Sequence, residues 1–222
     1  MRFIFKFIMN TVVYMNFKQF EISKIPDHAF CLCIGKRNTG KSTLLSRLVK
    51  EKQTTSVKDT LVMCGTQEEH DMYSKLNNVV IYSGYTPDIL HTYTEKQKIS
   101  LRKDSLGVVL DTIEYENIWK DIHVRHLVRN GRCFRTFLYC SSSCIWFIPP
   151  YVRSNIDYVF LFKELNKDNL ERLYQSFGNM FETFKKFCEA FDTCTKELYG
   201  CMVIDNTSHS HRIEDVVFWF SV

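Results

Sequence analysis

Residues 30–42 read FCLCIGKRNTGKS, a short apolar run followed by a glycine-rich turn. Residues 35–42 fit the pattern G-x-x-x-x-G-K-[ST] at every fixed position. The apolar run before the turn has the length of a buried strand, and residues 43–49 have the pattern of an amphipathic helix. This context indicates a phosphate-binding loop, or P-loop, rather than a chance glycine-rich turn.

The residue types in this loop suit the chemistry of a triphosphate. Gly35 and Gly40 let the backbone approach where a Cβ would obstruct it, so that N–H groups can converge on the phosphates. Lys41 can place its ammonium on the outer phosphates, and the Ser42 hydroxyl can complete the oxygen shell of Mg²⁺. We therefore expect ATP and Mg²⁺ to be bound through Gly35, Lys36, Arg37, Asn38, Thr39, Gly40, Lys41, Ser42 and Thr43.

A second candidate site follows the apolar run at 106–110, where Asp111 comes directly after the predicted strand. A carboxylate there can hold Mg²⁺ together with Ser42, which is the Walker B role; the alternative is a residue that caps a turn. Hydrolases of this type carry an acid at the next position, which here is Thr112, and a hydroxyl cannot act as a base near neutral pH. Glu114 is our candidate catalytic base, with Glu116 as a second choice, and both are otherwise solvated loop charges.

Length and composition favour one domain. The 222 residues are 45% hydrophobic, enough to bury one sizeable core. We expect a P-loop ATPase domain over 15–222 and an N-terminal extension over 1–14, with Met15 as an alternative start. The extension has no signal cleavage site and is shorter than the roughly 20 residues of a membrane span, so we expect neither secretion nor membrane insertion.

Net charge and cysteine content exclude few further classes of protein. A net charge of +4 tolerates a nucleic-acid partner without requiring one. The nine cysteines do not form two C-x-x-C pairs, which argues against a disulfide framework and a structural zinc site. We expect reduced thiols, mostly in the core.

Short apolar runs alternate with helical stretches along the chain, a pattern typical of an α/β fold with a mostly parallel sheet flanked by helices. A strand pattern also begins at 16–22, and the apolar run at 216–220 is either an edge strand or a closing segment. The other predicted strands are 30–34, 60–64, 79–82, 106–110, 134–140, 157–162 and 201–204, and the predicted helices are 41–51, 68–75, 87–102, 117–129, 168–176 and 180–198.

Several segments in this order resemble the poxvirus-type DNA-packaging ATPases of nucleocytoplasmic large DNA viruses, a branch of the FtsK/HerA superfamily. The resemblance implies a three-layer, additional-strand P-loop fold of the RecA/FtsK type. It also implies a homo-oligomeric ring that moves viral double-stranded DNA into the capsid, with a capsid or portal partner, in the host cytoplasm (the viral factory) or in the virion. The segments that carry it are residues 35–42, 62–66, 109–111, 129–132, 148–160, 203–207 and 214–217.

Arg153 is the position that the resemblance offers for an arginine acting on the nucleotide of a neighbouring subunit. The alternative is an ion pair with Asp157, four residues later. The chain departs from the family at Thr112 and at Ser143, where members usually carry an acid and a longer polar sensor. These departures leave a second function open, a hydrolysis-impaired paralogue that serves as a structural ring subunit. A kinase or GTPase is disfavoured, because the sequence has no Asn-Lys-x-Asp motif.

Two further patterns have competing interpretations. Arg125 and Arg129 lie four residues apart on a predicted helix, with Arg132 and Arg135 following, and form either a DNA-tracking strip or a solvated helix face. For Arg132, the alternative is that it stabilises the Asn-Gly-Arg turn. The phenylalanines at 177, 181, 184, 187 and 191 have helical spacing and indicate core or subunit packing rather than a cofactor site.

Overall fold

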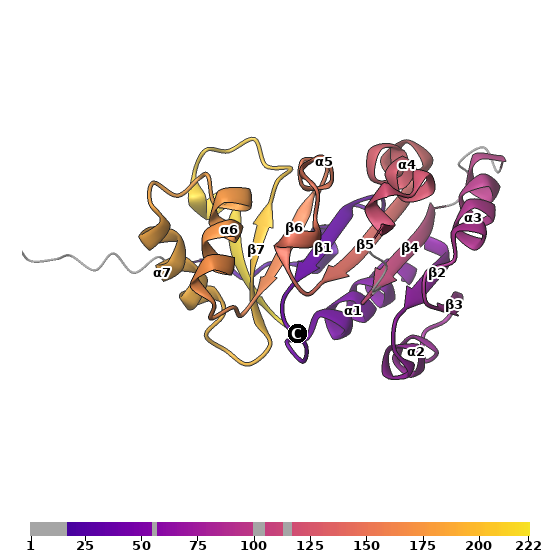
Figure 1. Cartoon of the computed structure of the whole chain (residues 1–222), viewed down its shortest axis with the longest axis horizontal. Coiled ribbons are helices and arrows are strands. Elements are labelled where there is room, and N and C mark those ends of the chain that lie inside the picture. Colours follow the sequence, from indigo (N-terminus) through magenta and orange to yellow (C-terminus); the bar gives the residue numbers. More distant parts are fainter. Residues whose placement is uncertain (1–16, 55–56, 100–104, 113–116) are drawn as a thin grey trace, which may run out of the picture.

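A single eight-stranded sheet forms the centre of the molecule in a computed structural model, which describes residues 17–54, 57–99, 105–112 and 117–222 (Figure 1). The strand order is β3-β2-β4-β5-β1-β6-β7-β8. The strands are β1 (Phe30–Ile34), β2 (Val57–Cys64), β3 (Val79–Ser83), β4 (Ser105–Asp111), β5 (Thr136–Ser142), β6 (Tyr158–Phe162), β7 (Gly200–Asp205) and β8 (Val217–Ser221).

The six strands from β3 to β6 pair in parallel. β7 pairs antiparallel with β6, and β8 pairs antiparallel with β7, so β8 runs in the same direction as the six parallel strands. The carboxyl ends of the parallel strands therefore meet at one edge of the sheet, where ligands bind in open α/β folds. β5 lies between β1, which leads into the P-loop, and β4, which ends at Asp111. One additional strand thus separates the two predicted halves of the site.

Helices cover both faces of this sheet and make three layers (Figure 1). One face packs against α1 (Lys41–Gln53) and α2 (Gln67–Tyr73). The other face packs against α3 (Pro87–Ile99), α4 (Ile122–Asn130), α5 (Pro150–Arg153), α6 (Lys167–Phe177) and α7 (Phe184–Cys194).

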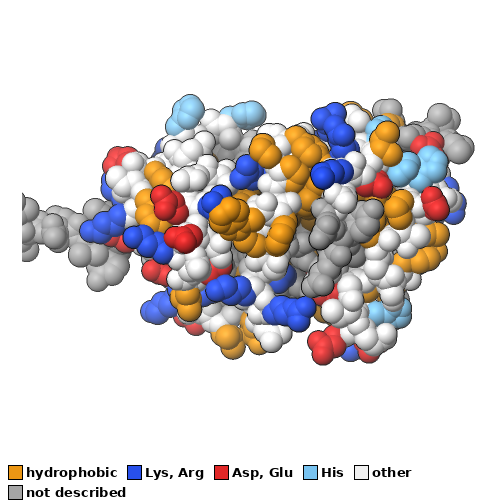
Figure 2. Space-filling model, in the orientation of Figure 1, with side chains coloured by type: hydrophobic (Ala, Val, Ile, Leu, Met, Phe, Trp, Pro, Cys, Tyr) orange, Lys and Arg blue, Asp and Glu red, His pale blue; other side chains and the backbone are white. Residues whose placement is uncertain are grey.

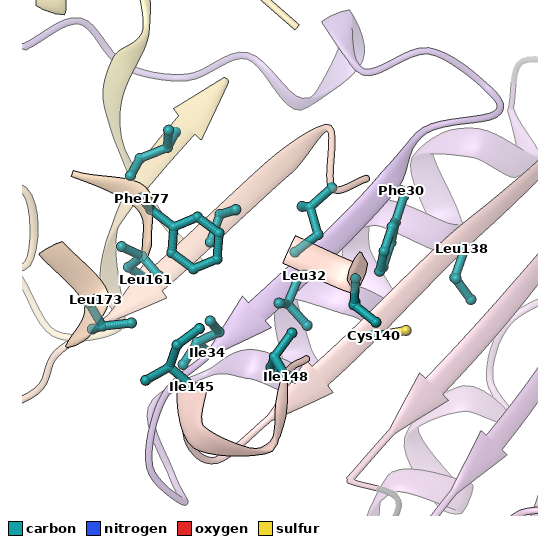
Figure 3. Packing of buried hydrophobic residues seen from close by; sticks show 14 of the residues in the cluster. Phe30, Leu32, Ile34, Leu138, Cys140, Ile145, Ile148, Leu161, Leu173 and Phe177 are labelled. Carbon is teal, nitrogen blue, oxygen red and sulfur yellow. The ribbon is translucent and has the colours of Figure 1, made fainter. Parts of the chain in front are cut away.

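Alternation along each strand divides the core between the two faces. In β1, Leu32 and Ile34 point into the larger cluster with Leu161 and Leu173 (Figure 3). Cys31 and Cys33 point the opposite way, into the cluster beneath α1. All five β1 residues are buried, which explains why this strand reads as a continuous apolar run.

Most predicted elements are present, with shifts of a few residues at their ends. The strand predicted at 16–22 is wrong in its described part, since Gln19 makes one isolated bridge and a single 3₁₀ turn follows at Ile22–Lys24. The helix predicted at 117–129 begins later, because Asp121 caps α4 by accepting hydrogen bonds from the backbone N–H groups of His123 and Val124. The apolar run at 216–220 is an edge strand, β8.

The phenylalanine series belongs to the core, as expected. Phe177 ends α6, Phe187 and Phe191 lie on α7, and all three are buried in the larger cluster. Among the described residues, no helix combines the length and apolar character needed to cross a membrane. Every cysteine lies in the described part of the chain and is a free thiol.

Candidate nucleotide-binding site

The P-loop joins the carboxyl end of β1 to the first residue of α1, Lys41. Gly40 has φ of 100°, in the left-handed region that glycine adopts at no steric cost, and Asn38 has φ of 60°. A Cβ at Gly35 would lie 2.6 Å from the Cβ of Phe162 and 2.8 Å from the Thr39 Oγ1. Both fixed glycines of the motif are therefore required by the backbone path.

Hydrogen bonds fix the loop against the sheet and against itself. The Gly35 N–H donates to the Ser142 carbonyl at 3.1 Å, which connects the loop to the end of β5. The Thr39 hydroxyl donates to the Lys36 carbonyl at 2.8 Å. The Lys36 ammonium lies 2.9 Å from the Glu164 carboxylate, just beyond β6. The loop is thus held from both neighbouring strands.

Lys41 is buried at the start of α1, and its ammonium donates to the Lys36 carbonyl at 2.8 Å. Burial lowers the pKa of Lys41, while the carboxylates of Asp111 and Glu69 oppose this shift. An ammonium in such a place is only partly compensated by its surroundings. It is suited to an added anion such as a phosphate.

Ser42 faces a carboxylate that is not among the predicted site residues. Its hydroxyl donates to the Glu69 Oε1 at 3.2 Å. The other carboxylate oxygen of Glu69 accepts the backbone N–H groups of Gly65 and Thr66, each at 3.1 Å. Thr66 and Glu69 form a capping box at the start of α2, which fixes this carboxylate beside the P-loop.

Asp111 is fully buried at the end of β4. Its carboxylate accepts hydrogen bonds from the Ser141 hydroxyl at 2.6 Å and from the Tyr73 hydroxyl at 2.9 Å. Burial and the nearby Glu69 raise the pKa of Asp111, whereas hydrogen bonds from Ser141, Tyr73 and Ser42 oppose the shift. The structure therefore brings Asp111 to Lys41 and Ser42, although one strand intervenes in the sheet.

The donor set at this point fits Mg²⁺. The Ser42 hydroxyl and the Asp111 carboxylate are hard oxygen ligands, the type that Mg²⁺ selects in combination with water and phosphate oxygens. Two buried carboxylates side by side carry negative charge that a divalent cation would compensate. Ser42 and Asp111 are the residues that we predicted for the metal, and the Glu69 carboxylate lies beside them.

The predicted catalytic base cannot be placed in the same way, because Glu114 and Glu116 lie outside the described residues. Thr112 has φ of 49°, and its backbone N–H donates to the Ser141 hydroxyl at 2.8 Å. Of the three serines at 141–143, Ser141 lies on β5 and contacts Asp111, whereas Ser143 follows the strand and is exposed. Ser141, the serine nearest the site, thus lies two residues before Ser143, the position that the resemblance matched to the polar sensor.

Arg153 lies away from its own P-loop. It ends α5, which leads into the amino end of β6, and it donates to the Ser176 hydroxyl at 2.8 Å. The alternative pairing with Asp157 is wrong, because the Arg132 guanidinium pairs with that carboxylate. Asp157 also accepts the Phe30 N–H at 2.8 Å, so Arg132 stabilises the start of β1.

The basic residues of α4 make aromatic contacts. The guanidinium groups of Arg125 and Arg129 each lie 5.7 Å from the centre of the Tyr151 ring. Both arginines are exposed. Figure 2 shows Lys and Arg side chains beside hydrophobic ones in the upper part of this face, in the region where Figure 1 labels α4 and α5. Arg125 and Arg129 thus contact the same Tyr151 ring, whereas Arg132 pairs with Asp157.

The missed residues are Glu69, Tyr73 and Ser141. A signal for Glu69 exists in the sequence, since Thr66-Gln67-Glu68-Glu69 is a capping-box pattern directly after an apolar strand. Tyr73 and Ser141 have no such signal. Their hydroxyls reach Asp111 only because β2, β4 and β5 are neighbours in the sheet.

No protein-family model matches the chain. Protein 015R of Frog virus 3 is 29% identical over 194 residues, an alignment that covers 84% of this chain. The chain spans about three fifths of that relative's length, since the alignment covers 59% of it.

Two solved structures share the architecture. The genome packaging NTPase B204 of Sulfolobus turreted icosahedral virus 2, in complex with AMP, superimposes with a TM-score of 0.65 at 13% identity, over 84% of this chain and 96% of B204. The cytoplasmic domain of the type VII secretion ATPase EccC of Thermomonospora curvata gives a TM-score of 0.62 at 15% identity, over 89% of this chain and 25% of EccC. The fold is that of the additional-strand P-loop ATPases.

Proposed function

We propose that this chain is an ATP-hydrolysing motor subunit that moves viral double-stranded DNA into a capsid. The ATPase activity is supported by one observation: Lys41 and Ser42 of the P-loop lie beside two buried carboxylates, Asp111 and Glu69. This arrangement provides a cation for the phosphates, oxygen ligands for a metal and a second acid for the attacking water.

Asp111 and Ser42 would hold Mg²⁺, which when bound supplies positive charge that stabilises the phosphate oxygens during transfer. Lys41 orients the outer phosphates. Tyr73 and Ser141 position the Asp111 carboxylate by donating to its two oxygens.

We propose Glu69 as the residue that accepts the proton of the attacking water. Its Oε2 is fixed by two backbone N–H groups, while its Oε1 faces the Ser42 hydroxyl at the phosphate end of the site. A carboxylate can act as a base near neutral pH, and the hydroxyl of Thr112 cannot. Glu69, on α2 after the neighbouring strand β2, would thereby supply the acid that the chain lacks at Thr112.

The DNA-packaging role draws on the comparison with B204, of which this chain covers nearly the full length, and on the resemblance to the poxvirus-type ATPases. We propose a homo-oligomeric ring that works with a capsid or portal component in the viral factory or the virion. In such a ring, Arg153 would reach the nucleotide of the adjacent subunit. The exposed Arg125 and Arg129 are the first candidates for contacts with DNA phosphates.

Steady-state ATP hydrolysis, with and without double-stranded DNA, tests this proposal. We expect DNA to stimulate turnover, Lys41→Ala to abolish it, and Glu69→Gln to lower it by about 10²-fold or more while ATP binding persists. Gln can retain the capping box of α2, so the variant isolates the chemistry of the carboxylate. The exposed Glu189→Gln on α7 is the matched control.

Two results would separate the alternatives. ATP binding without DNA-stimulated turnover in the wild type would indicate the hydrolysis-impaired structural subunit instead. Full activity of Glu69→Gln would remove Glu69 from the mechanism and return the role of base to Glu114.

A further inference from the structure

The P-loop has two ends that face different parts of the sheet. Ser42 faces Glu69, on α2 just after β2, and Asp111, at the end of β4; both strands lie on one side of β1. The outermost phosphate and the metal belong at this end. The nucleoside of a bound nucleotide must therefore leave the loop elsewhere.

The opposite side of α1 faces a different part of the sheet. Thr43 is exposed one residue after Ser42, and Arg47 lies four residues further along the same helix face. The Arg47 guanidinium lies 5.2 Å from the centre of the Phe220 ring, on β8. The Thr43 face of α1 is thus directed toward β7 and β8. In the sheet, β7 and β4 lie two strands from β1 on opposite sides.

An exposed aromatic residue lies against the P-loop on this side. A Cβ at Gly40 would be 3.3 Å from the Tyr199 Cβ and 3.4 Å from its Cδ1, so the Tyr199 side chain packs directly on the loop. Even so, 46% of Tyr199 is exposed, as is 77% of the preceding residue, Leu198. These two residues form an apolar step beside the phosphate-binding turn.

The backbone at this step is held in an unusual conformation. Tyr199 has φ of 59°, in the left-handed region that bulky residues rarely adopt. Hydrogen bonds on both sides fix the turn: Gly200 N–H donates to the Glu197 carbonyl at 3.0 Å, and the Ser221 hydroxyl donates to the Leu198 carbonyl at 3.4 Å. Such strain in a fixed turn is typical of functional positions.

We propose that Tyr199 and Leu198 form the nucleobase platform of the ATP site, with the Tyr199 ring stacking on the base. The inference rests on the proposed ATPase function. The two chemical parts of the ligand would be bound separately, the triphosphate by the P-loop and the aromatic base by this step before β7. A stacked aromatic ring is a sequence-tolerant way of binding a base, because every base offers a π face.

Calorimetric titration with two probes tests the platform, Mg·ATP and Mg·tripolyphosphate, the second of which lacks the nucleoside. We expect Tyr199→Ala to weaken Mg·ATP binding about tenfold and to leave Mg·tripolyphosphate binding unchanged. Tyr199→Phe keeps the ring and should bind both as the wild type does. Lys41→Ala should lose both probes, and Ile122→Ala, an exposed apolar residue on α4, should lose neither.

A Tyr199→Trp variant gives a second readout that does not depend on truncating the residue. Its fluorescence should be quenched by Mg·ATP and not by Mg·tripolyphosphate. The platform is overturned if Tyr199→Ala binds Mg·ATP like the wild type, or if it weakens both probes equally, which would mean that Tyr199 only supports the loop. A wild type that binds neither probe would instead overturn the proposed ATPase function and the platform with it.

Discussion

Asp111 combines complete burial with two hydrogen-bond donors, and its charge state links stability to function. Because its pKa is raised above 3.8 in the folded protein, the fold disfavours the ionised form. A residue kept at such a position despite this cost is typical of a functional site.

Asp111→Asn should therefore stabilise the nucleotide-free protein at neutral pH. We expect a gain of about 2–4 °C in Tm, corresponding to roughly 1 kcal/mol, together with loss of ATP hydrolysis. Because its pKa is raised on folding, Asp111 keeps its proton to a higher pH in the folded state than in the unfolded state. Its contribution to the free energy of unfolding therefore falls as the pH rises from 3.8 through the raised pKa. The difference in Tm between the variant and the wild type should shrink as the pH is lowered.

Thermal unfolding between pH 5 and 8 measures this difference, with the exposed Asp192→Asn as the control. A variant less stable than the wild type at pH 7 would show that the hydrogen bonds from Tyr73 and Ser141 outweigh the cost of burying the charge.

At the scale of the elements, β4 and β5 fit together through one glycine. Gly107 and Phe137 are partners in the parallel register of these two strands. A Cβ at Gly107 would lie 2.1 Å from the Cζ of Phe137 and 2.6 Å from both Cε atoms. The Phe137 ring fills the space of the missing side chain and stacks on Tyr139 at a centroid distance of 4.2 Å.

Gly107→Ala should destabilise the protein by about 1–3 kcal/mol through overpacking. Phe137→Leu alone should also destabilise it, because it truncates a buried ring. In the double variant the smaller side chain leaves room for the new methyl group, so the loss should be less than the sum of the two single losses. Urea unfolding of the four proteins in a double-mutant cycle measures this coupling. Strictly additive losses would contradict the predicted contact.

At the scale of the whole molecule, the P-loop and Arg153 lie at different edges of the sheet. The P-loop follows the carboxyl end of β1, whereas α5 leads into the amino end of β6 (Figure 1). Arg153 lines a pocket with Trp146, Pro149 and Arg172. Within one chain it is not directed at the phosphates, so a role in hydrolysis requires a second subunit.

Mixing two inactive variants tests this role. Lys41→Ala and Arg153→Ala rings should each be inactive, and rings mixed from both should regain part of the DNA-stimulated turnover, because some interfaces then join an intact P-loop to an intact arginine. As a control, Arg172→Ala subunits are mixed with Lys41→Ala subunits, because Arg172 lines the same pocket as Arg153. Full activity of Arg153→Ala alone would exclude the arginine from catalysis.

Much of the architecture could be predicted because its signals are local. The apolar run of β1, the glycines of the P-loop and the amphipathic pattern of α1 each depend on neighbouring residues. The N-terminal strand was predicted wrongly, because its alternating pattern is equally compatible with a segment that crosses the cluster beneath α1 and pairs at a single bridge. Phe20 and Ile22 are buried there without a ladder.

Sequence alone therefore determined the P-loop motif and the carboxylate at the end of β4, since the motif and the end of the strand each depend on consecutive residues. Only the tertiary structure decided which groups surround them: Glu69 and Tyr73 from α2, Ser141 from β5 and Tyr199 from the turn before β7. These side chains come from segments far apart in the chain. Their meeting depends on strand order and register, which arise from packing of the whole sheet rather than from any local pattern.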